Sequence, residues 1–251
     1  MAESAPSGGV KKGLWVAVPA YTGFIAVETA HSLNMEMLEA FNRNIPFLLT
    51  FHEQDSIITR CRNCMVMNFL ASDPAHFTDM IFIDSDVGFP PGAMLRLAEY
   101  PRDIVGAVYP YRKDPLGFPV QFIGGAAQRD RDTGLTKVAG IPAGFLKISR
   151  AALELIMAKF PDHWYHEANV PQGKAFRFFD FVQINHKFFG EDYAFCGIAR
   201  EAGLDIWCDT NITLKHIGAK HFIGNLQEFI DAEAGVSDPF AAIHEFNRKH
   251  G

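Results

Sequence analysis

The sequence predicts an α/β domain with an open, twisted, mostly parallel sheet that is covered by helices on both faces. Three observations lead to this prediction. Short unbroken apolar runs recur along the first half of the chain, stretches with helical spacing separate them, and several runs end at a proline, glycine or aspartate. Unbroken apolar runs are typical of parallel strands that are buried on both faces. The 251 residues, 48% hydrophobic and 21% charged, suffice for one large domain with a full core.

The first half alternates strands and helices in the order of a doubly wound sheet. Helical spacing marks three helices, with Asp55 or Ser56 expected to cap the second and Pro91 expected in the first turn of the third. We expect strands at 14–18, 45–50, 80–83 and 104–108 and helices at 26–42, 56–71 and 91–99.

The second half is less regular. Residues 112–140 are rich in Gly, Asp and Arg, which is typical of loops with short strands, and the aromatic residues 161–189 show no clean periodicity. The regular elements expected here are strands at 141–149 and 204–208 and helices at 151–160 and 191–202. Because no linker or internal repeat is visible, we predict a flexible tail at 1–12, one domain at 13–225, and a helical tail at 226–251 that packs on the domain.

The composition argues against several classes of protein. The formal net charge is −6 and no run of Lys or Arg occurs, which does not favour nucleic-acid binding. No apolar run reaches transmembrane length, the first 12 residues do not resemble a signal peptide, and four cysteines do not suggest a disulfide framework. These observations favour a cytoplasmic protein. An acidic protein that handles an anionic nucleotide needs local positive charge, which a bound metal ion would supply.

The strongest candidate for a site is Asp84-Ser85-Asp86, which follows the apolar run 80–83. Ligands bind at the carboxyl ends of strands in open α/β sheets. An extended Asp-x-Asp segment would point both carboxylates to the same side, where they could share one hard cation. A capped strand-to-helix turn explains the same residues without any ligand, since Asp is common in turns. The apolar run before the motif and Pro90-Pro91 after it favour the functional interpretation.

Three further groups are weaker candidates. Glu191 and Asp192 stand in the first turn of the predicted helix 191–202, where acids either complement the helix dipole or act as a general base or a sugar-hydroxyl ligand. His216 follows a strand-like stretch, and a neutral imidazole there could complete the shell of a cation, particularly Mn²⁺. In the predicted helix 56–71, Arg60, Arg62 and Asn63 either reach a base or a phosphate or belong to a solvated helix face.

Several segments follow one another in a recognisable order between about 14 and 218. They are Val18-Pro19-Ala20-Tyr21, Arg62-Asn63, Phe82-Ile83-Asp84-Ser85-Asp86 with Phe89-Pro90-Pro91, Asp103-Ile104-Val105-Gly106-Ala107 with Tyr109 and Arg112, Ala143–Ile148, Gly190-Glu191-Asp192 and Lys215-His216-Ile217-Gly218. Each segment is loose alone, but their common order resembles that of GT-A-type glycosyltransferases, particularly family-2-like and Anp1-like members of bacterial or viral type.

This resemblance implies a Rossmann-like GT-A fold and a transferase that uses Mn²⁺ or Mg²⁺. The enzyme would move a sugar from a nucleotide-diphosphate sugar, UDP before GDP, to a hydroxyl of a glycan, protein or small molecule. We expect inversion if Asp192 lies on the face opposite the leaving group, and retention if no base lies there. The resemblance also implies a role for each matching residue. It places Pro19, Ala20 and Tyr21 around the nucleoside, and Arg62, Asn63 and Ser85 at the nucleotide. Asp84 would lie at the ribose or at the metal and its water, and Asp86 and His216 would bind the metal. Gly144 would lie under the donor sugar or the acceptor, and Asp192, with Glu191 beside it, would be the base.

Two other functions use similar residues. A nucleotidyltransferase that makes nucleotide sugars also needs a strand-end carboxylate and a cation, but Pro19–Gly23 has one glycine and no lysine where a basic, glycine-rich phosphate loop is expected. A non-catalytic nucleotide-sugar binding protein is the third hypothesis. Homo-oligomerisation stays open. The acidic residue that the family often has in its nucleoside pocket has two candidates here, Glu28 and Asp55.

Overall fold

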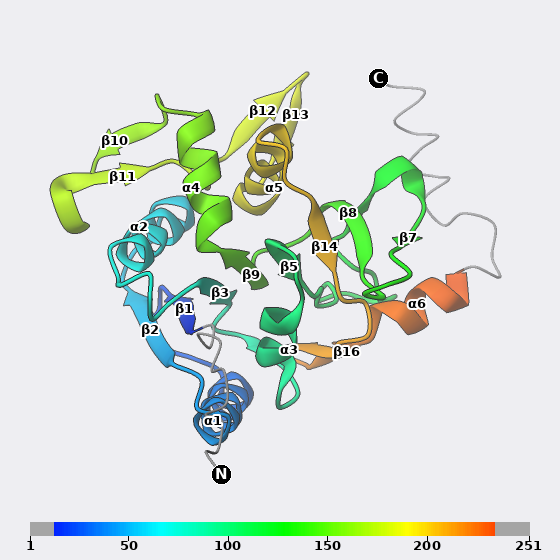
Figure 1. Ribbon diagram of the computed structural model, residues 1–251. Helices are drawn as coiled ribbons and strands as arrows, with labels where there is room; N and C mark the ends of the chain where they lie inside the picture. Colours follow the sequence, from blue (N-terminus) through cyan, green and yellow to red (C-terminus); the bar gives the residue numbers. More distant parts are fainter. Residues whose placement is uncertain (1–12, 234–251) are drawn as a thin grey trace, which may run out of the picture.

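The centre of the molecule is a nine-stranded mixed sheet, seen in a computed structural model that describes residues 13–233 (Figure 1). The strand order is β2-β1-β3-β9-β5-β14-β8-β6, with β7 paired to β8. Strands β1, β2, β3, β5 and β14 run in one direction, and β9 and β8 run against them. The predicted α/β class with a mostly parallel sheet is therefore confirmed.

The first half of the chain alternates strands and helices as predicted. Its elements are β1 (Leu14–Ala20), α1 (Val27–Asn42), β2 (Phe47–Glu53), α2 (Ile58–Leu70), β3 (Asp79–Ile83), β4 (Val87–Gly88), α3 (Ala93–Glu99) and β5 (Ile104–Gly106). Strand β4 lies outside the large sheet and pairs with β15 (Leu214–His216), which also pairs with β16 (Phe222–Gly224).

The second half adds short strands and three helices within the described residues. They are β6 (Gln121–Phe122), β7 (Gln128–Arg129), β8 (Thr136–Gly140), β9 (Phe145–Ser149), α4 (Arg150–Lys159), β10 (Trp164–His166), β11 (Lys174–Phe176), β12 (Val182–Ile184), β13 (Lys187–Phe189), α5 (Glu191–Glu201), β14 (Ile206–Cys208) and α6 (Leu226–Glu233). The segment without clean periodicity forms two small antiparallel hairpins, β10–β11 and β12–β13. Such short strands are too brief for a period to emerge.

Successive side chains of a strand point to opposite faces of the sheet, so the buried strands contribute to two hydrophobic layers, one on each face. On one face the strands contribute Val16, Ile81 and Val105, which share a core with Leu33 of α1 and Met94 of α3. On the other face Ala17, Phe82 and Ile206 join the core formed by Phe69 of α2, Leu153 of α4 and Phe195 of α5. Figure 1 shows α1 and α3 on one side of the sheet and α2, α4 and α5 on the other.

Strand β9 lies antiparallel between β3 and β5, so these two parallel strands are not neighbours. The sequence predicted a strand at 141–149 without its direction. Phe145–Ile148 are fully or nearly fully buried, as residues of an inner parallel strand would be. An apolar run reports burial on both faces, and an antiparallel strand in the middle of a covered sheet is buried in the same way.

Two predicted helix starts are wrong. Helix α2 has Ile57 at its N-cap without a side-chain cap, and Asp55 instead accepts a hydrogen bond from Ile57 N at 3.1 Å. Helix α3 begins after Gly92, whose φ of 78° is left-handed, so Pro90 and Pro91 precede the helix. A left-handed residue at this point favours glycine, and it turns the chain between the prolines and the helix.

The C-terminal part of the described chain packs on the domain through α6. Leu226 is buried, and the ring of Phe229 lies 5.2 Å from that of Phe118. The predicted tail at 1–12 and residues 234–251 lie outside the described residues. Within 13–233, none of the helices combines the length and apolar character that crossing a bilayer requires.

Candidate active site

The turn at 84–86 is held on both sides by backbone hydrogen bonds. Strand β3 ends at Ile83, and Asp84 N donates to Gly144 O at 3.0 Å, while Val87 N donates back to Asp84 O at 3.1 Å. On the other side, Ile217 N donates to Asp86 O at 2.8 Å. The segment is therefore a tight turn and not the extended Asp-x-Asp that the sequence suggested, so the two carboxylates have different partners.

Asp84 has a partner at each carboxylate oxygen. Arg62 Nη2 donates to Oδ1 at 2.7 Å, and the hydroxyl of Tyr109 donates to Oδ2 at 3.1 Å. Below them, a β-carbon at position 144 would lie 2.2 Å from Asp84 Oδ2, so only glycine fits beneath this carboxylate. Gly144 thus makes room for Asp84, which is the role its contacts give it here.

Arg62 is the buried cation of the site. It is 3% exposed, it packs between the rings of Phe82 and Phe179, and its Nε lies 3.5 Å from Glu191 Oε1. A buried guanidinium is tolerated only with paired charge, which Asp84 and Glu191 supply. Its Nη1 is buried without a hydrogen-bond acceptor among the described residues. This atom is therefore a buried donor that no described residue satisfies.

Asp86 faces a different pair of residues. Its Oδ2 contacts the guanidinium of Arg112, and its Oδ1 lies 3.9 Å from Nε2 of His216. The other ring nitrogen of His216, Nδ1, lies 2.9 Å from the carbonyl oxygen of Pro110. Since a carbonyl only accepts, Nδ1 carries the proton and Nε2 presents its lone pair towards Asp86. Burial lowers the pKa of His216, which keeps the ring neutral at pH 7.

Tyr109 joins the two halves of the site. Its hydroxyl donates to Asp84, and its ring packs on the ring of His216 with centroids 4.6 Å apart. Burial raises the pKa of this phenol well above its usual value, so Tyr109 stays protonated and remains a donor. The Asp84–Arg62 cluster and the Asp86–His216 pair therefore lie on either side of one tyrosine.

The second acidic motif forms the first turn of α5, as predicted. Glu191 and Asp192 follow the N-cap Gly190, and Asp192 Oδ1 accepts a hydrogen bond from Tyr193 N at 2.8 Å. Burial, and next the charge of Glu191, raises the pKa of Asp192 to about 6, while Arg62 opposes the rise. A carboxyl group with such a pKa is mostly ionised at neutral pH and is a stronger base than an ordinary aspartate.

The end of β1 lies beside the turn. Strands β1 and β3 are parallel, with Ala17 opposite Phe82, so Pro19, Ala20 and Tyr21 follow at the level of 84–86. Pro19 and Ala20 are buried, and Tyr21 is 61% exposed. The backbone of Ser85 accepts a hydrogen bond from Ala26 N at 2.8 Å, which ties the turn to the start of α1. These residues form one wall next to Asp84.

Asn63 is placed differently from the expectation that it holds a nucleotide. Its side chain is 3% exposed, its Oδ1 accepts from Phe178 N and Phe179 N, and its Nδ2 donates to Phe179 O at 3.0 Å. The amide is thus fully engaged by the backbone of the aromatic segment. Neighbouring residues of one helix point in different directions, and here Arg62 reaches the site while Asn63 anchors the chain behind it.

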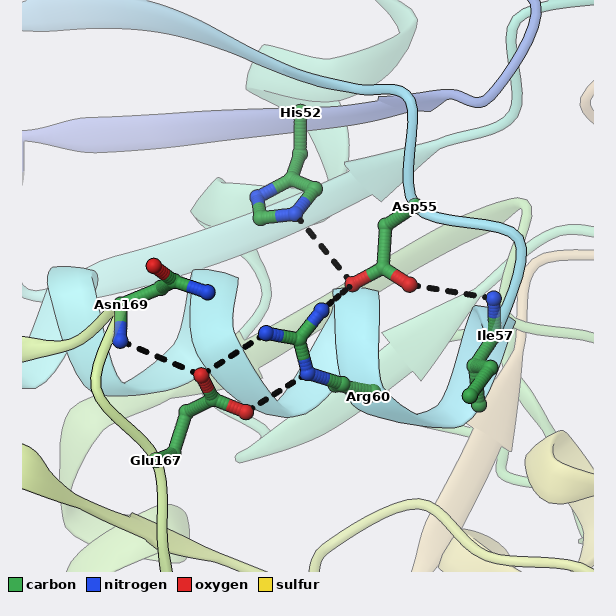
Figure 2. A network of polar contacts seen from close by, with 6 residues as sticks. All are labelled: His52, Asp55, Ile57, Arg60, Glu167 and Asn169. Atoms are coloured by element: carbon green, nitrogen blue, oxygen red, sulfur yellow. Dashed lines mark hydrogen bonds and ion pairs between the residues drawn. The ribbon is translucent and has the colours of Figure 1, made fainter.

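Both candidates for an acidic residue of the nucleoside pocket lie beside a basic or imidazole side chain. Asp55 belongs to a network with His52, Arg60 and Glu167 (Figure 2). Arg60 bridges the carboxylates of Asp55 at 2.8 Å and Glu167 at 2.6 Å, which ties the start of α2 to the loop after β10. The other candidate, Glu28, lies 3.2 Å from Nε2 of His221.

Within residues 13–233, no group of three or more His, Cys, Asp or Glu side chains is placed to hold a metal ion. The set Asp84, Asp86 and His216 is therefore not assembled as three ligands, because both oxygens of Asp84 bind Arg62 and Tyr109. Asp86 and His216 lie close enough to each other to share a cation. Two ligands that each lie about 2.1 Å from one ion are about 3 to 4.2 Å apart, and Asp86 Oδ1 and His216 Nε2 are 3.9 Å apart. A histidine that donates its other nitrogen to a carbonyl is typical of metal ligands.

A separate hollow of about 530 Å³ lies on the other face of β15. Neighbouring residues of a strand point to opposite faces, and Lys215 lines this hollow whereas His216 faces Asp86. Its other walls include Val27, His31 and Phe89. This hollow is thus separate from the cluster of acids and arginines.

Tyr109 and Arg112 were not among the residues expected to act in the site. In the sequence they are only members of a segment that resembles the family, because a single tyrosine or arginine after a strand carries no local pattern. The signal that could have found them is their position just after β5, whose carboxyl end lies at the same edge of the sheet as that of β3.

No protein-family model matches the sequence, and no curated protein matches it. Among solved structures, the catalytic domain of Drosophila β1,4-galactosyltransferase 7 in complex with xylobiose is similar over 86% of this chain and 71% of that chain, with 14% identity and a TM-score of 0.43. A glycosyltransferase involved in the glycosylation of the major capsid of PBCV-1 is similar over 60% of this chain and 67% of that chain, with 11% identity and a TM-score of 0.29. These values are too low to transfer any residue role, and the site rests on the geometry of this chain.

Proposed function

We propose that this chain is a glycosyltransferase that moves a sugar from a nucleotide-diphosphate sugar to an acceptor hydroxyl with inversion. One observation carries the proposal. Asp192, a carboxyl group with a pKa of about 6, belongs to the acidic cluster around Asp84, and Tyr109 connects that cluster to the Asp86–His216 pair. A base on one side of Tyr109 and a pair that could bind a cation on the other side are what transfer to a hydroxyl requires.

The divalent cation, Mn²⁺ or Mg²⁺, is proposed to bind Asp86 and His216. When bound, such an ion stabilises the negative charge that develops on a leaving diphosphate. The charge of the chain favours this arrangement, because the site gathers more carboxylates than guanidinium groups. The carboxylates are Asp84, Asp86, Glu191 and Asp192, and the guanidinium groups are those of Arg62 and Arg112.

The nucleotide is proposed to lie along the end of β1. Pro19, Ala20 and Tyr21 would contact the nucleoside, and the Ser85 hydroxyl would face the nucleotide from the turn. Arg62 Nη1 would donate to a nucleotide oxygen, because this buried donor has no acceptor among the described residues. Asp84, held by Arg62 and Tyr109, would contact the ribose or a water of the cation. UDP is the first candidate and GDP the second.

Asp192 is proposed to accept the proton of the acceptor hydroxyl. As the acceptor oxygen forms its bond to the anomeric carbon, its O–H proton passes to the Asp192 carboxylate. The bond from the anomeric carbon to the diphosphate oxygen breaks, and the electron pair stays on the diphosphate. Attack from the face opposite the leaving group inverts the anomeric centre. Glu191, which is next to Asp192, would bind a sugar hydroxyl.

The test is transfer itself. The full chain is incubated with Mn²⁺, a panel of UDP- and GDP-sugars and saccharide acceptors, and the nucleoside diphosphate and the glycosylated product are measured. We expect product with wild type, a loss of about 100-fold or more with Asp192→Asn, and wild-type rates with Glu201→Gln, which removes a carboxylate at the far end of the same helix. Nucleotide-sugar binding without turnover would contradict the proposal, and release of pyrophosphate from a nucleoside triphosphate and a sugar phosphate would replace it by a nucleotidyltransferase.

A further inference from the structure

Arg112 occupies one side of the carboxylate that the proposed cation needs. Its guanidinium contacts Oδ2 of Asp86, while Oδ1 of the same carboxylate faces His216. The side chains of Arg112 and Asp86 are 40% and 36% exposed, so the pair lies at the mouth of the site and not in its core. The Asp86 carboxylate, where the proposed cation would bind, is thus already paired with a positive group.

Asp86 and His216 are fixed by backbone structure. Val87, which follows Asp86, pairs with His216 in the β4–β15 ladder, and Ile217 N donates to Asp86 O at 2.8 Å. The His216 ring is held by Pro110 O and by the Tyr109 ring. These contacts hold the Asp86 backbone and the His216 ring, and none of them involves Arg112.

Arg112 belongs to a different unit, the loop 111–117. This loop is closed by the hydrogen bond from Tyr111 N to Gly117 O at 2.8 Å, and Asp114 pairs with Lys220 at its far side. The Arg112 stem lies on Gly218, where a β-carbon would be 3.2 Å from Arg112 Cδ. The guanidinium therefore reaches Asp86 on a long, half-exposed side chain that can change rotamer without any change in β4 or β15.

We infer that Arg112 competes with the divalent cation for Asp86 and, once displaced, binds the diphosphate of the donor nucleotide. The inference rests on the proposed function. Without nucleotide, the protein should bind the cation weakly, because the ion must first break the Arg112–Asp86 pair. The nucleotide should offset the loss of that pair, because the released guanidinium forms charge-assisted hydrogen bonds with its phosphate oxygens. Cation and nucleotide then bind with positive coupling, and each raises the affinity for the other by the same factor.

Binding measurements on the full chain test separately whether Arg112 competes with the cation and whether it binds the diphosphate. Mn²⁺ affinity is measured first without nucleotide, by electron paramagnetic resonance, and UDP affinity is then measured at saturating Mn²⁺ by calorimetry. The variants are Arg112→Ala, Arg112→Gln, which keeps the side-chain length, and Lys113→Ala. The last is the matched control, because it removes one positive charge from the same loop while Lys113 lies over the Tyr111 ring, 4.7 Å from its centroid.

Both Arg112 variants are expected to bind Mn²⁺ about threefold or more tightly than wild type and to bind UDP with Mn²⁺ about tenfold more weakly. Lys113→Ala is expected to change both constants by less than about twofold. Unchanged Mn²⁺ affinity in both Arg112 variants, or an equal change in Lys113→Ala, overturns the inference alone. Absence of Mn²⁺ binding to wild type, or equal binding by wild type and Asp86→Asn, overturns the proposed metal site together with the inference.

Discussion

Gly144 and Asp84 are packed so closely that a β-carbon at position 144 would lie 2.2 Å from Oδ2 of Asp84 and 2.7 Å from the Tyr109 ring. Gly144→Ala must therefore push the carboxylate away from Tyr109 and Arg62. We expect the free energy of unfolding to fall by about 1–3 kcal/mol and donor turnover to fall by about tenfold or more. Thermal denaturation and steady-state rates measure the two effects.

The control for Gly144→Ala is Gly197→Ala in α5. A β-carbon at Gly197 meets nothing within 4 Å, and the residue lies inside a regular helix. This variant should gain about 0.5–1 kcal/mol, because alanine is a better helix former than glycine, and its turnover should be unchanged. Full activity of Gly144→Ala would mean that the position of Asp84 does not matter for the reaction.

Tyr109→Phe removes the donor to Asp84 Oδ2 and leaves the ring on His216. The lost hydrogen bond to a charged acceptor is expected to cost about 1–2 kcal/mol of stability and to lower kcat/KM by about tenfold. Tyr100→Phe is the matched control, because Tyr100 also donates to an aspartate, Asp209, at 2.9 Å. Both variants should be less stable, and only Tyr109→Phe should lose kcat/KM. Equal kinetics in the two variants would assign Tyr109 a structural role alone.

Activity should depend on the ionisation of Asp192. Because its pKa is raised to about 6, the carboxylate that accepts the proton is lost as the pH falls through that value. We expect kcat/KM to be level above pH about 7 and to fall by about tenfold per unit below pH about 6. The measurement is a pH–rate profile between pH 4.5 and 8.5, corrected for the ionisation of the substrate over the same range. A profile that stays flat down to pH about 5 would remove Asp192 as the base.

The same carboxyl group should lower stability at neutral pH. Its pKa is 3.8 ordinarily and about 6 in the folded protein, so between these values the folded state binds more protons than the unfolded state. Stability attributable to Asp192 is therefore highest below pH about 4, falls as the pH rises to about 6, and stays low above it. Asp192→Asn should be more stable than wild type at pH 7.5, by up to about 3 kcal/mol, and the difference should vanish near pH 4. Melting curves at both pH values test this, and an equal difference at both would exclude the ionisation as its cause.

The parts of the fold that were predictable are those with a local signature. The unbroken apolar run before Asp84 predicts a buried strand whose carboxyl end presents polar residues, and β3 and its turn lie there. Glu191 and Asp192 follow a glycine and open a helix, and α5 begins at Glu191. In both places, the spacing of apolar residues and the residue types at the turn determine the local structure within a few residues. Distant parts of the chain are not needed to predict it.

The parts that were missed depend on contacts between distant segments. Nothing in residues 145–149 reports the direction of β9, because burial on both faces looks the same in either direction. The neighbours Arg62 and Asn63 have opposite roles, one in the site and one beneath Phe178 and Phe179, which only the packing of α2 decides. Arg112 meets Asp86 across 26 positions of sequence through a loop that has no periodic pattern.

The proposed cation site is tested by the rate of UDP release from UDP-sugars as a function of Mn²⁺ concentration, for wild type and for Asp86→Ala. The Asp86–His216 pair predicts a rate that rises with Mn²⁺, saturates, and is abolished by a chelator, with a loss of about 100-fold or more in the variant. A wild-type rate that does not respond to Mn²⁺ or Mg²⁺, or equal turnover by Asp86→Ala, would show that Asp86 and His216 do not hold a catalytic cation.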